Sequence, residues 1–259
     1  MRGVGLAWRR EGLISEPELP VVECIGTMTA TQDLFTPIHK GLRSMLYGLS
    51  SRLQTNDFVD LTATRSLVND LENDFAIARS AGCIVCTLSQ HASDEETAIF
   101  PDAAKAGNEL VATLIEEHHD LARREASITR SAHSLLTIEK PEGRIEAGMR
   151  LNQSANELFA AYIAHMNREE TDLVPWMKEH FSDTQMAAMR GAIMGRTPPD
   201  RMSAILGWML PSLNVQELSG LIREVRPAMP PQAFKAVTEM CEARVDPARW
   251  GAVKQIVGI

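Results

Sequence analysis

The sequence predicts an all-α protein, an up-down four-helix bundle followed by a small C-terminal helical appendage. Three observations support this fold class. Aromatic residues make up only 5% of the 259 residues, and the alternation of β-branched residues that marks strands is missing. Four long segments carry apolar residues at the spacing of an amphipathic helix. Turn signals rich in Asn, Asp, Pro and Gly separate these segments.

The four amphipathic segments account for the bundle. They are, in order, Phe35–Leu49, Ile77–Ile99, Leu110–Leu121 and Leu151–Leu173, and the turn signals between them fall at 55–57, 101–102 and 140–143. Each segment is long enough for several helical turns, and each has one continuous apolar face. Short connections favour antiparallel neighbours, so the bundle is expected to run up and down.

The two ends of the chain have a different composition from the bundle. Residues 1–30 mix charges with prolines and contain no apolar stretch long enough for a signal peptide, so we expect a disordered N-terminal extension. Ser182 and Asp183 predict the start of a new helix, and prolines then divide 182–259 into short helices. The predicted domains are therefore 1–30, the bundle at 31–181, and the appendage at 182–259.

Composition and charge exclude several classes of function. The protein is 44% hydrophobic and 23% charged, which excludes wholesale disorder. A net charge of −8 argues against nucleic acid as a partner, and no apolar run approaches the roughly 20 residues that span a bilayer. The scattered cysteines indicate a reducing compartment, the cytoplasm. Cys83 and Cys86 are interpreted as buried small residues, with a redox disulfide as the alternative.

A short internal repeat carries the chemistry. His91 and His165 are each followed by Glu at +4 and +5, Thr at +6 and Pro at +10. The spacing of four places each histidine and its first glutamate, Glu95 or Glu169, on one face of a helix. The second glutamate of each repeat is turned about 100° away and is expected to face solvent.

These pairs interrupt the apolar faces of their helices, where a carboxylate is costly unless it is paired or binds a metal. His39 interrupts the first helix in the same way, with a satisfied core histidine as the alternative, and His118 or its neighbour His119 interrupts the third. The sequence midpoint between His91 and His118 falls close to the predicted turn at 101–102, and the midpoint between His118 and His165 falls on the turn at Pro141. An up-down bundle would therefore bring four histidines to one layer, although the His39–His91 connection needs a longer loop.

One histidine on the first helix, His-x-x-x-Glu on the second, one histidine on the third and His-x-x-x-Glu on the fourth resemble the hemerythrin-like (HHE cation-binding) domains. The phrases Pro37–Arg43 and Glu116–Leu121 also look like that family's local signatures. The resemblance covers 31–181 and implies two non-haem iron ions (Fe2+/Fe3+) with a bridging oxo or hydroxo group. It implies four terminal histidine ligands and two bridging glutamates: His39, His91, Glu95, His118, His165 and Glu169.

The chain also departs from the family's oxygen carriers. Those proteins have a second histidine one turn after the third-helix histidine, where this chain has Ala122, and a wider His-to-Asp spacing on the fourth helix, which is missing here. We therefore expect a small-molecule ligand, O2, NO or peroxide, that is sensed or scavenged rather than carried. The alternatives are a peroxide- or NO-consuming enzyme and an iron-responsive regulatory module. A protein partner or self-association could use the appendage.

Two further features near the histidines are open to interpretation. Tyr162 precedes His165 by one turn and either donates to a bound oxygen species or is a plain core residue. Glu116 and Glu117 are interpreted as part of a solvated helix face.

Overall fold

The computed structural model describes residues 33–71 and 84–259, and this part of the chain forms helices and no strands. The predicted all-α class is therefore confirmed. No helix within the described ranges is long and apolar enough to cross a membrane. The predicted extension at 1–30, together with Cys83 and the side chain of Cys86, lies outside the described residues.

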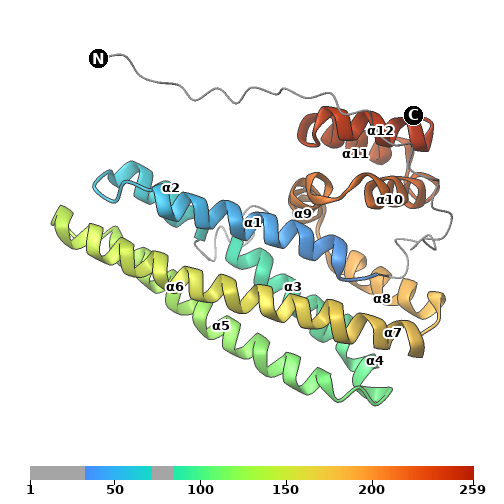
Figure 1. Ribbon diagram of the computed structural model, residues 1–259, viewed down its shortest axis with the longest axis horizontal. Helices are drawn as coiled ribbons and strands as arrows, with labels where there is room; N and C mark the ends of the chain where they lie inside the picture. The colour runs from blue at the N-terminus through green and yellow to red at the C-terminus, as the bar shows by residue number, and fades with distance from the viewer. Residues whose placement is uncertain (1–32, 72–83) are drawn as a thin grey trace, which may run out of the picture.

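Four helical columns form the bundle (Figure 1). They are α1 (Thr36–Thr55); α2 (Leu61–Leu71) and α3 (Ile84–Ala98), continued by α4 (Phe100–Lys105); α5 (Leu110–Leu135); and α6 (Pro141–Arg168), continued by the π-helix η2 (Glu169–Leu173) and α7 (Val174–His180). Helix α6 packs along α5 and against α1, while α2 and α3 pack on α5. The predicted four-helix bundle is confirmed.

The helix starts follow from local chemistry. Asp33 Oδ1 accepts hydrogen bonds from the backbone N–H groups of Phe35 (3.0 Å) and Thr36 (2.8 Å), which have no partner inside the helix. Pro37 lies in the first turn of α1, where its missing N–H costs nothing. Gly107, between α4 and α5, has φ +93°, a left-handed conformation that glycine adopts without strain.

Two apolar clusters fill the bundle and leave a layer between them. The central cluster draws on all four columns, through Leu42, Leu88, Leu121 and Tyr162 among others. The end cluster also draws on all four, through Phe35, Ile99, Leu114 and Leu173 among others. In every column a predicted histidine lies between these two residues in the sequence. The polar residues that interrupt each apolar face therefore form one layer between two dry regions.

The C-terminal helices follow as α8 (Asp183–Arg196), α9 (Pro199–Ser212), α10 (Val215–Ala228), α11 (Pro231–Arg244) and α12 (Pro247–Val257). The predicted cap is present, since Ser182 and Gln185 form a reciprocal capping box. Met186 and Met189 of α8 belong to the end cluster of the bundle, whereas α9 to α12 enclose a third apolar cluster of their own. Helix α9 packs on α1 (Figure 1). The domain limits at 31–181 and 182–259 remain predictions.

Candidate metal centre

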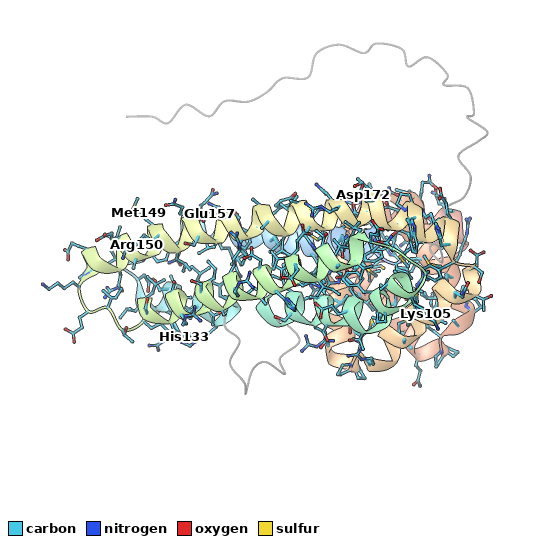
Figure 2. All side chains as sticks on the ribbon, turned by 90° about the horizontal axis from the view of Figure 1, so that it is seen from below. Lys105, His133, Met149, Arg150, Glu157 and Asp172 are labelled. Atoms are coloured by element: carbon cyan, nitrogen blue, oxygen red, sulfur yellow. The ribbon has the colours of Figure 1, made fainter. Side chains whose placement is uncertain are left out.

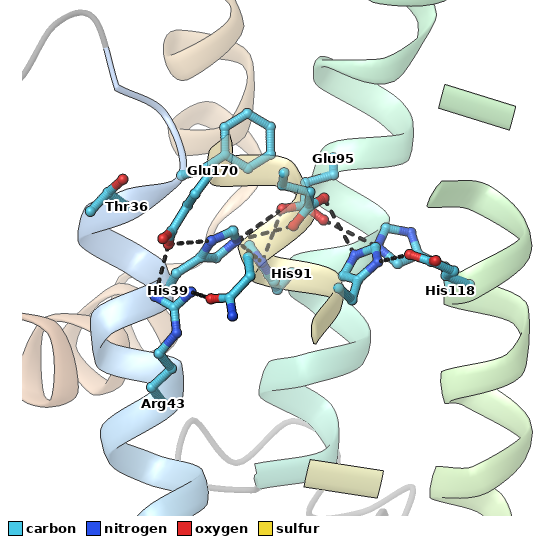
Figure 3. A network of polar contacts seen from close by, with 12 residues as sticks. Thr36, His39, Arg43, His91, Glu95, His118 and Glu170 are labelled. Carbon is cyan, nitrogen blue, oxygen red and sulfur yellow. Dashed lines mark hydrogen bonds and ion pairs between the residues drawn. The ribbon is translucent and has the colours of Figure 1, made fainter. Parts of the chain in front are cut away.

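The structure brings the six predicted site residues together in the layer between the central and end clusters. Their side chains are between 0% and 11% exposed. Figure 3 shows His39 on α1, Glu95 on α3 and His118 on α5 directed toward one another. His119 is 56% exposed, so His118 is the member of the tandem pair that faces the layer. His133 is exposed and lies at the far end of α5 (Figure 2).

Helical spacing presents the two histidine–glutamate pairs as predicted. Nε2 of His91 lies 3.0 Å from Glu95 Oε1, and Nε2 of His165 lies 3.3 Å from Glu169 Oε1. The second pair straddles the junction of α6 and η2, because Glu169 begins the π-helix.

The prolines at +10 of the repeat, Pro101 and Pro175, coincide with a break in the second and in the fourth column. Pro175 lies in the first turn of α7, directly after η2, and Pro101 lies in the first turn of α4, after α3 has ended. Proline lacks an N–H and clashes with the carbonyl one turn earlier, so a regular α-helix does not continue through it. Single π turns inside helices often occur at functional sites. The sequence analysis missed these breaks, although the repeated proline was the available signal.

The six side chains form two overlapping groups. The first set is His39, His91, Glu95 and Glu169, and the second set is Glu95, His118, His165 and Glu169. Within each set, one possible ligand atom from every residue lies within 4.8 Å of the others. Each set therefore has two histidines of its own, and both sets share the two glutamates.

Several atoms of this layer are buried without a hydrogen-bond partner. Both carboxylate oxygens of Glu95, both of Glu169 and Nε2 of His165 are in this condition among the described residues. Leaving a buried polar atom unpaired costs about 1–3 kcal/mol, and more for a charged group. Metal cations bound in the two sets would satisfy these atoms, and imidazole nitrogen with carboxylate oxygen is a donor set that suits iron or manganese. The residues thus fit a pair of metal ions.

Carboxylates outside the layer accept hydrogen bonds from three of the histidines, each through Nδ1, the ring nitrogen that is directed away from the layer. The pairs are His39 Nδ1 with Glu170 Oε1 (3.0 Å), His118 Nδ1 with Glu96 Oε1 (2.9 Å), and His165 Nδ1 with Glu117 Oε2 (2.9 Å). A carboxylate only accepts, so each Nδ1 carries a proton, and each Nε2, which becomes a ligand atom once its own proton leaves, is directed at the layer. The expectation that the second glutamate of each repeat faces solvent was wrong for Glu170, and for Glu96, whose side chain is 36% exposed, it missed the bond to His118. The solvated-face interpretation of Glu117 was also wrong.

Two arginines hold two of these three outer carboxylates, Glu170 and Glu117. Arg43 Nη1 donates to Glu170 Oε1 at 2.8 Å, and its Nη2 donates to Asn167 Oδ1 at 2.9 Å. Arg168 donates to Glu117 in the same way. These contacts orient the imidazole rings of α1 and α6 before any ion binds, because each arginine positions the carboxylate on which a ring depends.

The charges of the layer shift the pKa values of its members. Burial alone lowers the pKa of His39, but the carboxylates of Glu170, Glu95 and Glu169 outweigh it and raise the pKa to about 9. The pKa of His118 is also raised to about 9, against burial, by Glu95 and Glu96. Protons on these imidazoles therefore balance the buried carboxylates when no metal is bound, and metal binding would displace them.

On the side of the central cluster, next to the layer, Tyr162 and Glu125 form a buried pair that is not among the candidate metal ligands. The Tyr162 hydroxyl donates to Glu125 Oε1, and Ser89 Oγ donates to Glu125 Oε2 at 2.9 Å. The tyrosine hydroxyl therefore has a partner already, which favours the core interpretation. Burial raises the pKa of Glu125. Sequence reasoning missed Glu125, although it follows His118 by two helical turns and so lies on the same face.

An all-α bundle in which each column sends a histidine into one buried layer with two shared glutamates defines a cation-binding bundle. The chain belongs to the family of the hemerythrin HHE cation binding domain, whose sequence model matches residues 30–177, more than half of its length. The resemblance found in the sequence is thereby confirmed. Comparison with curated proteins and with solved structures gave no match.

Proposed function

We propose that this protein is a non-haem di-iron protein that binds O2 or a related small oxidant, NO or peroxide, and senses or scavenges it. The observation that carries the proposal is the buried layer itself, with two sets of donors sharing two glutamates whose oxygens otherwise meet only the imidazole nitrogens of the same layer. Bound iron would supply redox chemistry and coordination positions open to a small ligand.

The residues have separate tasks in this proposal. His39 and His91 would hold one ion, His118 and His165 would hold the other, and Glu95 and Glu169 belong to both sets and would serve both ions. Glu170, Glu96 and Glu117 keep the histidine rings oriented through Nδ1. The central and end clusters exclude water above and below the layer, which protects a bound small molecule from solvent.

The ligand count supports sensing or scavenging over reversible carriage. The third column has Ala122 where the carriers' second histidine would lie, so the second set has two histidines rather than three. The cytoplasmic location belongs to the same proposal and rests on the scattered cysteines.

The experiment is anaerobic loading with Fe(II), desalting, and measurement of iron per chain and of the near-ultraviolet spectrum before and after air is admitted. We expect two ions per chain and new absorption bands on oxidation. The double variant Glu95→Gln, Glu169→Gln should lose both. Glu116→Gln is the matched control, because this carboxylate is 79% exposed. Iron content below one ion per chain in the wild type, unchanged in the double variant, would refute the proposal.

An enzyme built on the same layer is distinguished by turnover. Steady-state consumption of peroxide or NO in the presence of an electron donor would establish catalysis, whereas a sensor or scavenger without a reductant reacts once per loaded centre.

A regulatory module that responds to iron is a second candidate, and one observation favours it. Helix α1, which carries His39, is also the bundle helix on which α9 packs.

A further inference from the structure

Helix α1 is in contact with the candidate metal centre on one face and with the C-terminal helices on the opposite face. His39 is directed into the buried layer, and Gly41 lies two residues later, about 200° around the helix. A Cβ atom added at Gly41 would lie 3.0 Å from Cα and 3.1 Å from the backbone N of Met209 in α9. The backbones of α1 and α9 are therefore in direct contact, with no space between them.

A second contact ties the residue next to His39 to helix α10. Lys40 Nζ lies 2.5 Å from Glu217 Oε1. The other carboxylate oxygen of Glu217 accepts a hydrogen bond from the backbone N–H of Asn214 at 2.8 Å, which completes the cap of α10. The start of α10 is thus anchored to α1 within one residue of a candidate ligand.

The side chain of His39 is also held by a close contact within the bundle. Its Nδ1 donates to Glu170, which Arg43 of the next turn also holds. A displacement of α1 at Gly41 cannot be absorbed locally, since packed interiors have few voids and helices are stiff over one turn. Movement of α9 and movement of His39 are therefore mechanically linked.

The two metal sets differ in whether they take a histidine from α1. The first set takes His39 from α1, whereas the second set takes its own histidines, His118 and His165, from α5 and α6. Of the bundle helices, α1 is the one on which α9 packs extensively. Docking of α9 and α10 therefore reaches the first set through a histidine that the second set does not use.

We propose that docking of α9 and α10 on α1 controls the first set, so that occupancy of this set by a metal ion and docking of the C-terminal helices strengthen each other, while the second set is independent of docking. This inference rests on the proposed function and specifies its regulation. Linkage between two equilibria is reciprocal. A change that weakens the docking of α9 therefore lowers the affinity of the first set for its metal ion, and binding of that ion strengthens the docking of α9 by the same factor.

The test uses two backgrounds that isolate the sets. His118→Ala leaves the first set complete, and His91→Ala leaves the second. Gly41→Val is introduced into each background, and Fe(II) affinity is measured anaerobically. We expect binding about tenfold weaker or more in the His118→Ala background and no change in the His91→Ala background.

Gly48→Val is the matched control. Gly48 lies on the same helix and is exposed, and an added Cβ there would meet no atom within 4 Å. The two substitutions change the intrinsic helix propensity by the same amount, so they differ in the contact with α9. Circular dichroism of the metal-free variants checks that each one folds.

A milder variant serves if Gly41→Val fails to fold. Glu217→Gln keeps the cap of α10, because glutamine also accepts at this position, but removes the ion pair with Lys40. It should weaken Fe(II) binding in the same background and by a smaller factor. In the parent backgrounds, Fe(II) should also slow amide hydrogen exchange in α9 when the first set is intact and leave it unchanged when only the second set remains.

The outcomes separate this inference from the proposed function. If wild type binds two ions but Gly41→Val acts like Gly48→Val, or weakens both sets equally, the coupling is wrong and the di-iron proposal stands. Unchanged hydrogen exchange in α9 on loading the first set would also overturn the coupling. If wild type binds no iron, both proposals fail.

Discussion

Replacing Glu170 by glutamine should weaken the first metal set without unfolding the protein. Glu170 accepts two charge-assisted hydrogen bonds, from His39 Nδ1 at 3.0 Å and Arg43 Nη1 at 2.8 Å, and its side chain is 22% exposed. Hydrogen bonds to charged groups contribute about 1.5–3 kcal/mol. Arg43 retains Asn167 as a partner, so the loss falls mainly on His39. We expect a loss of about 2 kcal/mol, or about thirtyfold in affinity.

The assay is an anaerobic Fe(II) titration of Glu170→Gln in the His118→Ala background, where only the first set is complete. Glu116→Gln in the same background is the control. The substitution is nearly isosteric, so the melting temperature of the metal-free protein at pH 9.5 should change little. At that pH His39, with a pKa of about 9, is largely neutral and gains little from the carboxylate.

The result that would refute this reasoning is an Fe(II) affinity in Glu170→Gln within twofold of its parent. Glu170 would then be an ordinary surface-side carboxylate, and the orientation of His39 would be set by packing alone. An equal loss in the His91→Ala background would also contradict it, since that background lacks the first set.

Three further predictions follow from burial and charge. In the metal-free protein, His39 and His118 have pKa values of about 9, above the usual 6.5. Their contribution to stability is therefore complete below pH 6.5 and is lost as the pH rises through about 9. The melting temperature should fall across this window, and it should fall less after iron loading. Burial raises the pKa of Glu125, and a carboxyl with a raised pKa stabilises the fold most below its unfolded value of 4.5. Glu125→Gln should therefore gain stability relative to wild type in urea unfolding as the pH rises above 4.5, and a constant difference would contradict this. Leu114→Ala, at a side chain 0% exposed in the end cluster, should cost about 2–5 kcal/mol, whereas Leu61→Ala, at 44% exposure, should cost less than about 0.5 kcal/mol in the same measurement.

Much of this site was accessible from periodicity. The spacing of four that pairs His91 with Glu95 is a property of one helix, and it holds wherever that helix packs. The comparison of sequence midpoints with turns also placed His118 and His165 at one height, because short connections make neighbouring helices antiparallel. These inferences required only that the segments be helical and the loops short.

The outer carboxylates could not be assigned in the same way. Glu117 reaches His165 across 48 residues, and Glu170 reaches His39 across 131. A residue near the edge of a helix face turns toward a neighbouring helix or toward water according to the rotation of that helix, and periodicity does not fix this rotation to within one side chain. The second glutamates were therefore assigned to solvent, whereas the packed bundle directs them to histidines.

The sequence by itself determined the all-α class, the four-helix pattern and the six polar residues on its buried faces, because burial of a periodic apolar face is a local requirement. Helix α2 (Leu61–Leu71) was not among the predicted helices. Only the tertiary structure decided which histidines share a set, that Glu125 pairs with Tyr162, and that Gly41 touches α9. Those contacts join segments far apart in the chain, and their geometry depends on how whole helices pack against one another.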